Sequence, residues 1–308
     1  MNDVSHSVVD WGTSSFRLWA LDRAGRVLGQ RRSAQGLIAA ASEGFDRVLE
    51  SHLAALSVGE DVPVMMCGMV GARSGWVEAA YVDAPAGLDG LADRAVHVPS
   101  TRRPIRILPG IAQRGADGAD VMRGEETQLL ALLAQGFEGL ACLPGTHSKW
   151  VWVAQRQVQR FATFMTGELF HLLRSGSTLA PAVEAAEMDP EGPCFAQGVA
   201  DGLAAADTLG SQLFRLRASW LLEHTAPADS LGRLSGLLVG SELAGAARLF
   251  GRPSTLALIA SGPAAEVYGR ALALAGLPHI VRYDAEELVR AGLHAAALSA
   301  FRLERACA

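Results

Sequence analysis

Two segments of the chain combine glycine, hydroxyl and charged residues in a similar order. The first runs Asp10-Trp11-Gly12-Thr13-Ser14-Ser15, and the second runs Pro144-Gly145-Thr146-His147-Ser148-Lys149. In both, a strand-like apolar stretch leads into a short turn, and a second strand follows. Backbone N–H groups and hydroxyls in such turns can donate hydrogen bonds to phosphate oxygens. One such turn is weak evidence, but a pair in the two halves of the chain predicts a nucleotide held between two α/β lobes.

Lys149, in the second turn, is the only lysine among the 27 basic residues of the chain. A composition so strongly biased towards arginine indicates that either cation serves at most surface positions. A compact ammonium retained beside a Gly-Thr turn therefore indicates a role in binding phosphate. The alternative is a lysine kept by chance at a strand end.

The composition favours a globular protein that acts on small metabolites. Half of the 308 residues are hydrophobic, the net charge is −5, and the arginines are scattered. We therefore expect no nucleic-acid partner and no membrane partner. The first residues lack the pattern of a secretory signal, which predicts a cytoplasmic location. The four cysteines are far apart without metal-ligand spacing, so we interpret them as reduced residues with packing roles.

Strand-like and helix-like segments alternate along the chain, which predicts an α/β fold. A polar stretch over residues 113–120 suggests a boundary between an N-terminal lobe of residues 1–116 and a C-terminal lobe of residues 117–308. The second lobe repeats the opening plan, with a strand, a Gly-Thr turn and two further strands. Mostly helical sequence follows from Phe195 to Phe250, and then a strand, a Ser-Gly-Pro turn and a helix.

Six segments together resemble the 2-dehydro-3-deoxygalactonokinases, which belong to the sugar kinase, heat-shock protein and actin superfamily. The segments are DWGTSS at 10–15, GMVGARSGW at 68–76, DVMRGEETQ at 120–128, PGTHSKW at 144–150, FMTGE at 164–168 and SGP at 261–263. The first and fourth are specific in combination, whereas SGP alone is weak. The resemblance spans nearly the whole chain. It implies two ribonuclease-H-like lobes, as in actin-like ATPases, with a nucleotide cleft between them.

The resemblance also implies roles for the residues of the turns. The first turn would bind phosphate through Asp10, Gly12, Thr13 and Ser14, and the second through Gly145, Thr146, His147 and Lys149. Ser261 and Gly262 would face the adenosine of ATP. By analogy, Asp10 would hold Mg²⁺ through water, which agrees with the preference of this cation for a few carboxylates and retained waters. The alternative for Asp10 is a carboxylate that accepts hydrogen bonds from turn amides.

Phosphoryl transfer to a hydroxyl needs a carboxylate that accepts the proton. Asp120 and Glu125 are the two candidates, and the sequence does not separate them. Sugar kinases of the superfamily commonly place an Asp after a Gly here; Glu125 matches that spacing and Asp120 matches the residue type. Alternatively, Asp120 caps a helix and Glu125 and Glu126 complement its dipole.

The implied acceptor is a six-carbon 2-oxo-3-deoxy acid, whose pocket must neutralise a carboxylate and bind hydroxyls. Arg73 suits bidentate recognition of a carboxylate, Trp76 would form a flat wall, and Glu78 would accept hydrogen bonds from hydroxyls. Without the resemblance, a solvated Arg and a core Trp would be the better interpretation. Glu168 is a further candidate for the pocket, or it belongs to the first turn of a helix capped by Thr166.

The resemblance thus implies an ATP- and Mg²⁺-dependent kinase that phosphorylates the 6-hydroxyl of 2-dehydro-3-deoxy-D-galactonate in D-galactonate catabolism. One alternative is a kinase of the same fold for another sugar or sugar acid, since fold does not fix substrate. A second is a non-catalytic, nucleotide-dependent regulator or assembly protein. A homo-oligomer is compatible with the sequence, which does not define the oligomeric state.

Overall fold

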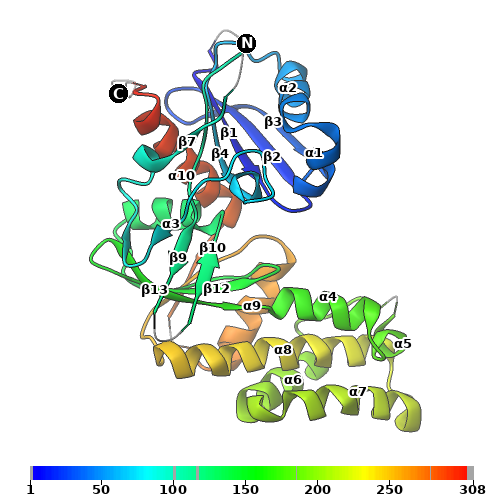
Figure 1. Cartoon of the computed structure of the whole chain (residues 1–308). Helices are drawn as coiled ribbons and strands as arrows, with labels where there is room; N and C mark the ends of the chain where they lie inside the picture. The colour runs from blue at the N-terminus through cyan, green and yellow to red at the C-terminus, as the bar shows by residue number, and fades with distance from the viewer. Residues whose placement is uncertain (1–2, 100–101, 116–117, 185, 278, 304–308) are drawn as a thin grey trace. The chain divides into compact units, whose positions relative to one another are not determined.

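The computed structural model describes residues 3–99, 102–115, 118–184, 186–277 and 279–303. The chain forms two compact units (Figure 1). Unit 1 comprises Met1–Glu138, Ala154–Arg160 and Ala285–Ala308, and unit 2 comprises Gly139–Val153 and Phe161–Asp284. The predicted boundary between residues 116 and 117 falls on residues outside the described part, and the division of the sequence at that point stays a prediction.

Unit 1 is built on a mixed sheet with the strand order β3-β2-β1-β4-β8-β7. Its strands are β1 (His6–Trp11), β2 (Phe16–Leu21), β3 (Val27–Ser33), β4 (Val64–Gly68), β7 (Val96–His97) and β8 (Ile105–Ile107). β1 pairs antiparallel with β2 and parallel with β4. The first three strands of the chain therefore form an antiparallel meander, and β1 lies in the middle of the sheet.

The central strands of this sheet are buried on both faces, whereas the edge strand β3 is mostly exposed. Successive side chains of a strand point to opposite faces, so neighbouring residues of β1 pack in different cores. Val9 packs in a core with α1 (Leu37–Glu43) and α2 (Phe45–Ala55). Val8 packs in a second core with α10 (Ala285–Ala300). Figure 1 shows these helices on opposite sides of the sheet.

The remaining elements of unit 1 are the helix α3 and several short segments. α3 (Glu125–Ala134) packs against α10. A small sheet has the order β10-β9-β5. The short elements are η1 (Met69–Gly71), β5 (Val82–Asp83), β6 (Ala86–Gly87), η2 (Ala92–Arg94), β9 (Ile111–Gln113) and β10 (Asp120–Met122).

Unit 2 contains a second mixed sheet, in which the strands β15-β14-β11-β12-β13 follow one another. Their bounds are β11 (Gly139–Leu143), β12 (Ser148–Ala154), β13 (Gln157–Phe164), β14 (Leu256–Ile259) and β15 (Ile280–Tyr283). The hairpin tip, residues 154–160, belongs to unit 1, where the first residues of β13 pair with β6. As in unit 1, a Gly-Thr turn joins an antiparallel pair of strands, here β11 and β12.

Helices make up the rest of unit 2. They are α4 (Thr166–Gly176), α5 (Ala180–Val183), α6 (Pro193–Ala204), η3 (Ala206–Thr208), α7 (Leu209–Glu223), α8 (Pro227–Phe250) and α9 (Pro263–Leu274). Side chains of α6, α8 and α9 pack with β11, β12 and β14 in one core. α7 packs against α8, and Figure 1 shows the two side by side. Among the described residues, no helix is long and apolar enough to cross a membrane.

Candidate active site

The first Gly-Thr turn is the tight connection between β1 and β2. The N–H of Gly12 donates to the carbonyl of Ser15 at 2.9 Å. Thr13 and Ser14 are exposed at its tip. The N–H of Leu37 donates to the carbonyl of Gly12 at 2.9 Å and so attaches the start of α1 to the turn. The tip therefore presents its hydroxyls to solvent from a firmly held backbone.

Asp10 lies at the end of β1, beside this turn. Its Oδ2 accepts a hydrogen bond from Arg17 Nη1 at 3.2 Å, and the side chain is 20% exposed. Burial raises the pKa of Asp10, the guanidinium of Arg17 opposes that rise, and the charge of Glu125 adds to it. Asp10 is thus a partly accessible carboxylate with a second carboxylate nearby.

Glu125 is brought to this place by a glycine before α3. Gly124 has a φ of 109°, and a Cβ built on it would lie 3.6 Å from Cα of Gly68, the last residue of β4. Because β1 and β4 are parallel neighbours with Trp11 opposite Gly68, their ends and the start of α3 converge. Glu125 Oε2 accepts a hydrogen bond from the N–H of Arg123 at 3.0 Å.

Asp120, the other candidate base, lies in β10. Its Oδ1 accepts a hydrogen bond from the N–H of Val121 at 2.7 Å, and its backbone pairs with Gln113. The charge of Glu125, for its part, is one of the causes that raise the pKa of Asp10. Within unit 1, the geometry therefore associates Glu125 with Asp10.

Glu126, which the sequence predicts only to complement the helix dipole, has an unusual environment. It is fully buried, and burial, followed by the charge of Glu125, raises its pKa to about 8. Its Oε2 accepts a hydrogen bond from the N–H of Gly124 at 2.6 Å, while Oε1 has no hydrogen-bond partner among the described residues. The only sequence signal for this environment is the helical spacing that places Glu126 with Leu129 and Leu133 on the buried face of α3.

The residues predicted to bind the acceptor follow β4 and η1 in one loop. Arg73 and Glu78 are exposed, and within the described part of the chain Arg73 makes no ion pair. Trp76 is half-buried and stacks on Phe45, with ring centroids 6.0 Å apart. The loop begins where β4 ends, next to the first Gly-Thr turn. It therefore brings the guanidinium of Arg73 to the side of unit 1 that carries Glu125.

The second Gly-Thr turn joins β11 to β12. Gly145, Thr146 and His147 are exposed, whereas the next two residues, Ser148 and Lys149, are buried. Lys149 is 4% exposed, and its Nζ donates to the carbonyl of His147 at 3.2 Å. The single lysine of the chain is therefore held against the backbone of the turn.

The start of α4 packs directly on this turn. A Cβ on Gly167 would lie 2.3 Å from the carbonyl oxygen of Gly145, so only glycine fits there. The N–H of Glu168 donates to the carbonyl of Thr146 at 2.9 Å, and the carboxylate of Glu168 pairs with His147 Nε2 at 2.5 Å. Glu168 thus contacts the second turn. Thr166, proposed as a helix cap, is the first residue of α4, and Met165 is the N-cap residue.

The Ser-Gly-Pro turn lies between β14 and α9. Ser261 Oγ donates to Asp284 Oδ2 at 2.8 Å. Gly262 is the N-cap residue of α9, with a φ of 59°, and in the described part of the chain no atom lies within 4 Å of a Cβ built on it. The start of α9 is therefore accessible for a ligand.

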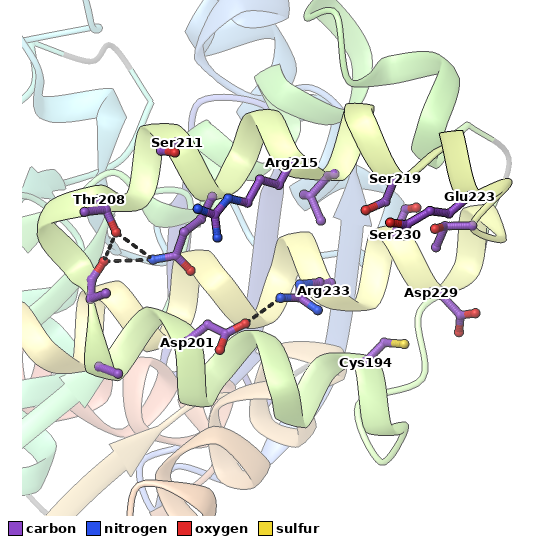
Figure 2. Close-up of a pocket in the computed structure, with 15 residues that line it drawn as sticks. Cys194, Asp201, Thr208, Ser211, Arg215, Ser219, Glu223, Asp229, Ser230 and Arg233 are labelled. Atoms are coloured by element: carbon purple, nitrogen blue, oxygen red, sulfur yellow. Dashed lines mark hydrogen bonds and ion pairs between the residues drawn. The ribbon is translucent and has the colours of Figure 1, made fainter. Parts of the chain in front are cut away.

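A cavity of about 530 Å³ lies elsewhere in unit 2, along α6, α7 and α8. Figure 2 shows Arg215 of α7 and Arg233 of α8 on its wall, the latter paired with Asp201 at 2.6 Å. None of the predicted site residues lines this cavity. Its mixture of cations and carboxylates does not select one class of ligand.

Comparison with solved structures defines the class of protein. The chain superposes on the activator of 2-hydroxyisocaproyl-CoA dehydratase from Clostridium difficile, solved with bound ADPNP, with a TM-score of 0.50 at 12% identity. That match covers 98% of this chain and 99% of the other, and it shows the fold. The protein is an α/β protein with two mixed sheets resembling those of actin-like ATPase lobes, which confirms the predicted fold class.

The chain belongs to the 2-keto-3-deoxy-galactonokinase family, whose model matches residues 10–296. It is 47% identical over 295 residues to a probable 2-dehydro-3-deoxygalactonokinase of Rhizobium meliloti (strain 1021), a match that covers 95% of this chain and 96% of the relative. The 2-dehydro-3-deoxygalactonokinase of Escherichia coli (strain K12) is 36% identical over 237 residues, 77% of this chain and 78% of that protein. A crystal structure of a protein assigned as a 2-dehydro-3-deoxygalactonokinase, from Sinorhizobium meliloti, superposes with a TM-score of 0.92 at 44% identity and covers 97% of this chain and 98% of that one.

The family resemblance read from the six segments is confirmed, and so is the enzyme class, a carbohydrate kinase. Membership in a kinase family implies ATP and a sugar acid as the two substrates. The matched region includes both Gly-Thr turns and Glu125.

Proposed function

We propose that this chain transfers the γ-phosphoryl group of ATP to the 6-hydroxyl of 2-dehydro-3-deoxy-D-galactonate, a step of D-galactonate catabolism in the cytoplasm. The observation that carries the proposal is the family match over residues 10–296, which includes every predicted site residue. The reaction breaks the bond between the γ-phosphorus and the β,γ-bridging oxygen of ATP, which leaves with ADP, and forms a bond from the γ-phosphorus to the acceptor oxygen. The hydroxyl proton leaves to a base.

We assign the role of base to Glu125. Glu125 is the first residue of α3 and only half-buried, so its carboxylate can reach a substrate and accept the hydroxyl proton. The electrostatic coupling of Glu125 with Asp10 supports this choice over Asp120. Asp120 remains the alternative, which separate substitutions of the two residues distinguish.

Asp10 is proposed to hold Mg²⁺ through a water molecule bound to the cation. The chemistry of the donors fits a hard cation, because Asp10 is partly accessible and Glu125 adds negative charge close by. When bound, Mg²⁺ would neutralise charge on the phosphate oxygens of ATP. The guanidinium of Arg17 balances part of the negative charge of Asp10 and lowers its pKa. Removal of Arg17 should therefore make Asp10 easier to protonate.

The remaining site residues bind and orient the substrates. Both turns would donate hydrogen bonds to phosphate oxygens of ATP. The donors are Gly12, Thr13 and Ser14 in the first turn, and Gly145, Thr146, His147 and Lys149 in the second. Ser261 and Gly262 would contact the adenosine. The exposed guanidinium of Arg73 would bind the acceptor carboxylate, Trp76 would flank the carbon chain, and Glu78 and Glu168 would accept from hydroxyls.

An assay of ADP release, coupled to NADH oxidation, tests the function. We expect turnover with 2-dehydro-3-deoxy-D-galactonate, weaker turnover with its gluco epimer, and none with an analogue that lacks the 6-hydroxyl. Phosphorus NMR of the product should show a phosphate monoester at carbon 6. Turnover confined to neutral sugars would overturn the substrate assignment, and ATP binding without any acceptor-dependent turnover would overturn the catalytic one.

A further inference from the structure

Helix α8 carries a buried carboxylate that the reaction as described does not use. Glu242 lies in the apolar segment GLLVGSELAG and is 2% exposed. Among the described residues it makes no ion pair with a cation. A carboxylate without hydrogen-bond partners would be costly at such a position, so its contacts must compensate for the loss of water.

Neutral donors from three other elements surround the two oxygens of Glu242. Trp150 Nε1 of β12 donates to Oε1 at 2.7 Å, and the hydroxyl of Tyr268 of α9 donates to Oε2 at 2.7 Å. Ser148 Oγ lies 2.8 Å from the hydroxyl of Tyr268. Burial raises the pKa of Glu242, and hydrogen bonds from the side chains of Thr166, Trp150, Tyr268 and Ser148 oppose this rise.

These partners stand on both flanks of the second Gly-Thr turn. Ser148 follows His147 directly and is fully buried, so its contacts fix the point where the turn enters β12. Thr166 begins α4, whose next two residues pack on Gly145 and bond to Thr146. One carboxylate therefore connects the strand that leaves the turn with the helix that supports it.

We propose that Glu242 is a positioning residue that holds the second Gly-Thr turn in the shape that binds the phosphates of ATP. The inference rests on the proposed assignment of this turn to ATP. It explains why a buried acid is placed in an apolar helix, where a residue serving only packing would be apolar. Its loss should weaken the binding of ATP more than the binding of the sugar acid, because Arg73, Trp76 and Glu78 lie in unit 1 and only Glu168 of the residues proposed for the acceptor lies beside this turn.

Three substitutions and one control test the proposal in the full-length protein. Glu242→Gln removes the charge and one acceptor, Tyr268→Phe removes one donor, and Trp150→Phe removes the other with little change in shape. Ser230→Ala is the matched control: Ser230 is a buried hydroxyl on the same helix, and its Oγ has no hydrogen-bond partner among the described residues. KM for ATP and KM for the sugar acid are measured separately, and the Kd of ATP is measured by calorimetry without acceptor.

We expect Glu242→Gln to raise KM and Kd for ATP roughly tenfold and to leave KM for the sugar acid within about twofold. Tyr268→Phe and Trp150→Phe should show the same selectivity with smaller effects, and Ser230→Ala should match the wild type. Equal changes in both KM values, or a lower melting temperature with unchanged ATP binding, would make Glu242 a purely structural residue. The calorimetric test does not depend on the acceptor, so a protein that binds ATP but fails on the sugar acid would refute the proposed function and still test this inference.

Discussion

At the scale of single residues, neighbouring acids in one helix turn have different chemistry because their surroundings differ. Glu125 and Glu126 are adjacent in sequence, yet Glu126 is fully buried with a raised pKa and Glu125 is half-buried beside Asp10. A protonated acid is a poor base, and an accessible carboxylate can reach a substrate. The environment therefore favours Glu125 over Glu126 for proton transfer.

Glu125→Gln should lower kcat by at least about a hundredfold, because it removes the base while keeping the size of the side chain. Asp120→Asn should lower kcat by less than about threefold, since Asp120 bonds to the backbone of its own short strand. Steady-state rates at saturating ATP and acceptor measure both, and KM for ATP serves as the internal control. A larger loss in Asp120→Asn would transfer the role to that residue.

The sequence predicted the residues of the turns more readily than the residues that support them. The Gly-Thr turns, the single lysine and the acids at the start of α3 are local patterns. Glu242 and Tyr268 lie 26 residues apart and meet only because α8 and α9 pack on the same sheet. A lone Glu in an apolar helix was the available signal for Glu242, but its partners depend on tertiary packing, which no local pattern encodes.

At the scale of elements, α6 and α8 are in backbone contact through four glycines. A Cβ on Gly198, Gly202, Gly236 or Gly240 would lie 2.3–2.5 Å from a carbonyl oxygen of the opposite helix. These helices also contribute Phe195, Val199 and Val239 to the core beneath the sheet of unit 2. The close contact therefore fixes the helix that carries Glu242.

Gly236→Ala should destabilise the protein by about 2 kcal/mol or more, because its methyl group would overlap the carbonyl of Phe195, built 2.3 Å away. Gly210→Ala is the control: Gly210 lies in α7, and no atom of the described residues is within 4 Å of a Cβ built on it. The control should be as stable as the wild type or slightly more stable, since Ala favours helix. Thermal unfolding followed by circular dichroism compares them, and equal melting temperatures would contradict the close contact.

Most long elements could be predicted from periodicity, and the exceptions have physical reasons. The apolar spacing from Glu125 to Leu133 predicts a helix, and α3 is present there, as are the strands around both turns. The helical spacing of apolar residues from Glu43 to Leu56 predicts a helix, and α2 (Phe45–Ala55) is present there. The preceding α1 was not predicted, and Gly44, with a φ of 96°, separates it from α2. The two- and three-residue strands β5, β6, β7, β9 and β10 were not predicted, since segments so short have no measurable period.

At the scale of the whole chain, the first strand, β1, and the last helix, α10, pack together within unit 1. Helix α10, near the C-terminus, covers the face of the sheet that contains Val8, close to the N-terminus. The apolar residues Val289, Leu293 and Ala296 have helical spacing, but their partner strand lies more than 270 residues earlier. The sequence could have predicted the helix, whereas its place in the fold is decided by long-range burial.

A pair of histidines lies at this junction. His6 of β1 is fully buried, and its Nε2 is 3.0 Å from Nδ1 of His294 of α10. The two rings stack with centroids 5.0 Å apart, and Ser5 Oγ bonds to Nδ1 of His6 at 2.6 Å. Burial, and then the charge of His294, lower the pKa of His6 from 6.5 to about 4, while Asp22 opposes the shift.

This low pKa predicts that acid weakens the attachment of α10 to the sheet. The folded state binds a proton on His6 less tightly than the unfolded state, so its stability should fall as the pH drops from about 6.5 and level off below about 4. Between pH 7.5 and pH 5 the loss due to His6 should be about 2 kcal/mol. Urea unfolding at both pH values measures it: His6→Gln should show a smaller difference than the wild type, and His97→Gln, at an exposed position of β7, should show the wild-type difference. If His6→Gln loses as much stability on acidification as the wild type, the buried pair does not control this response.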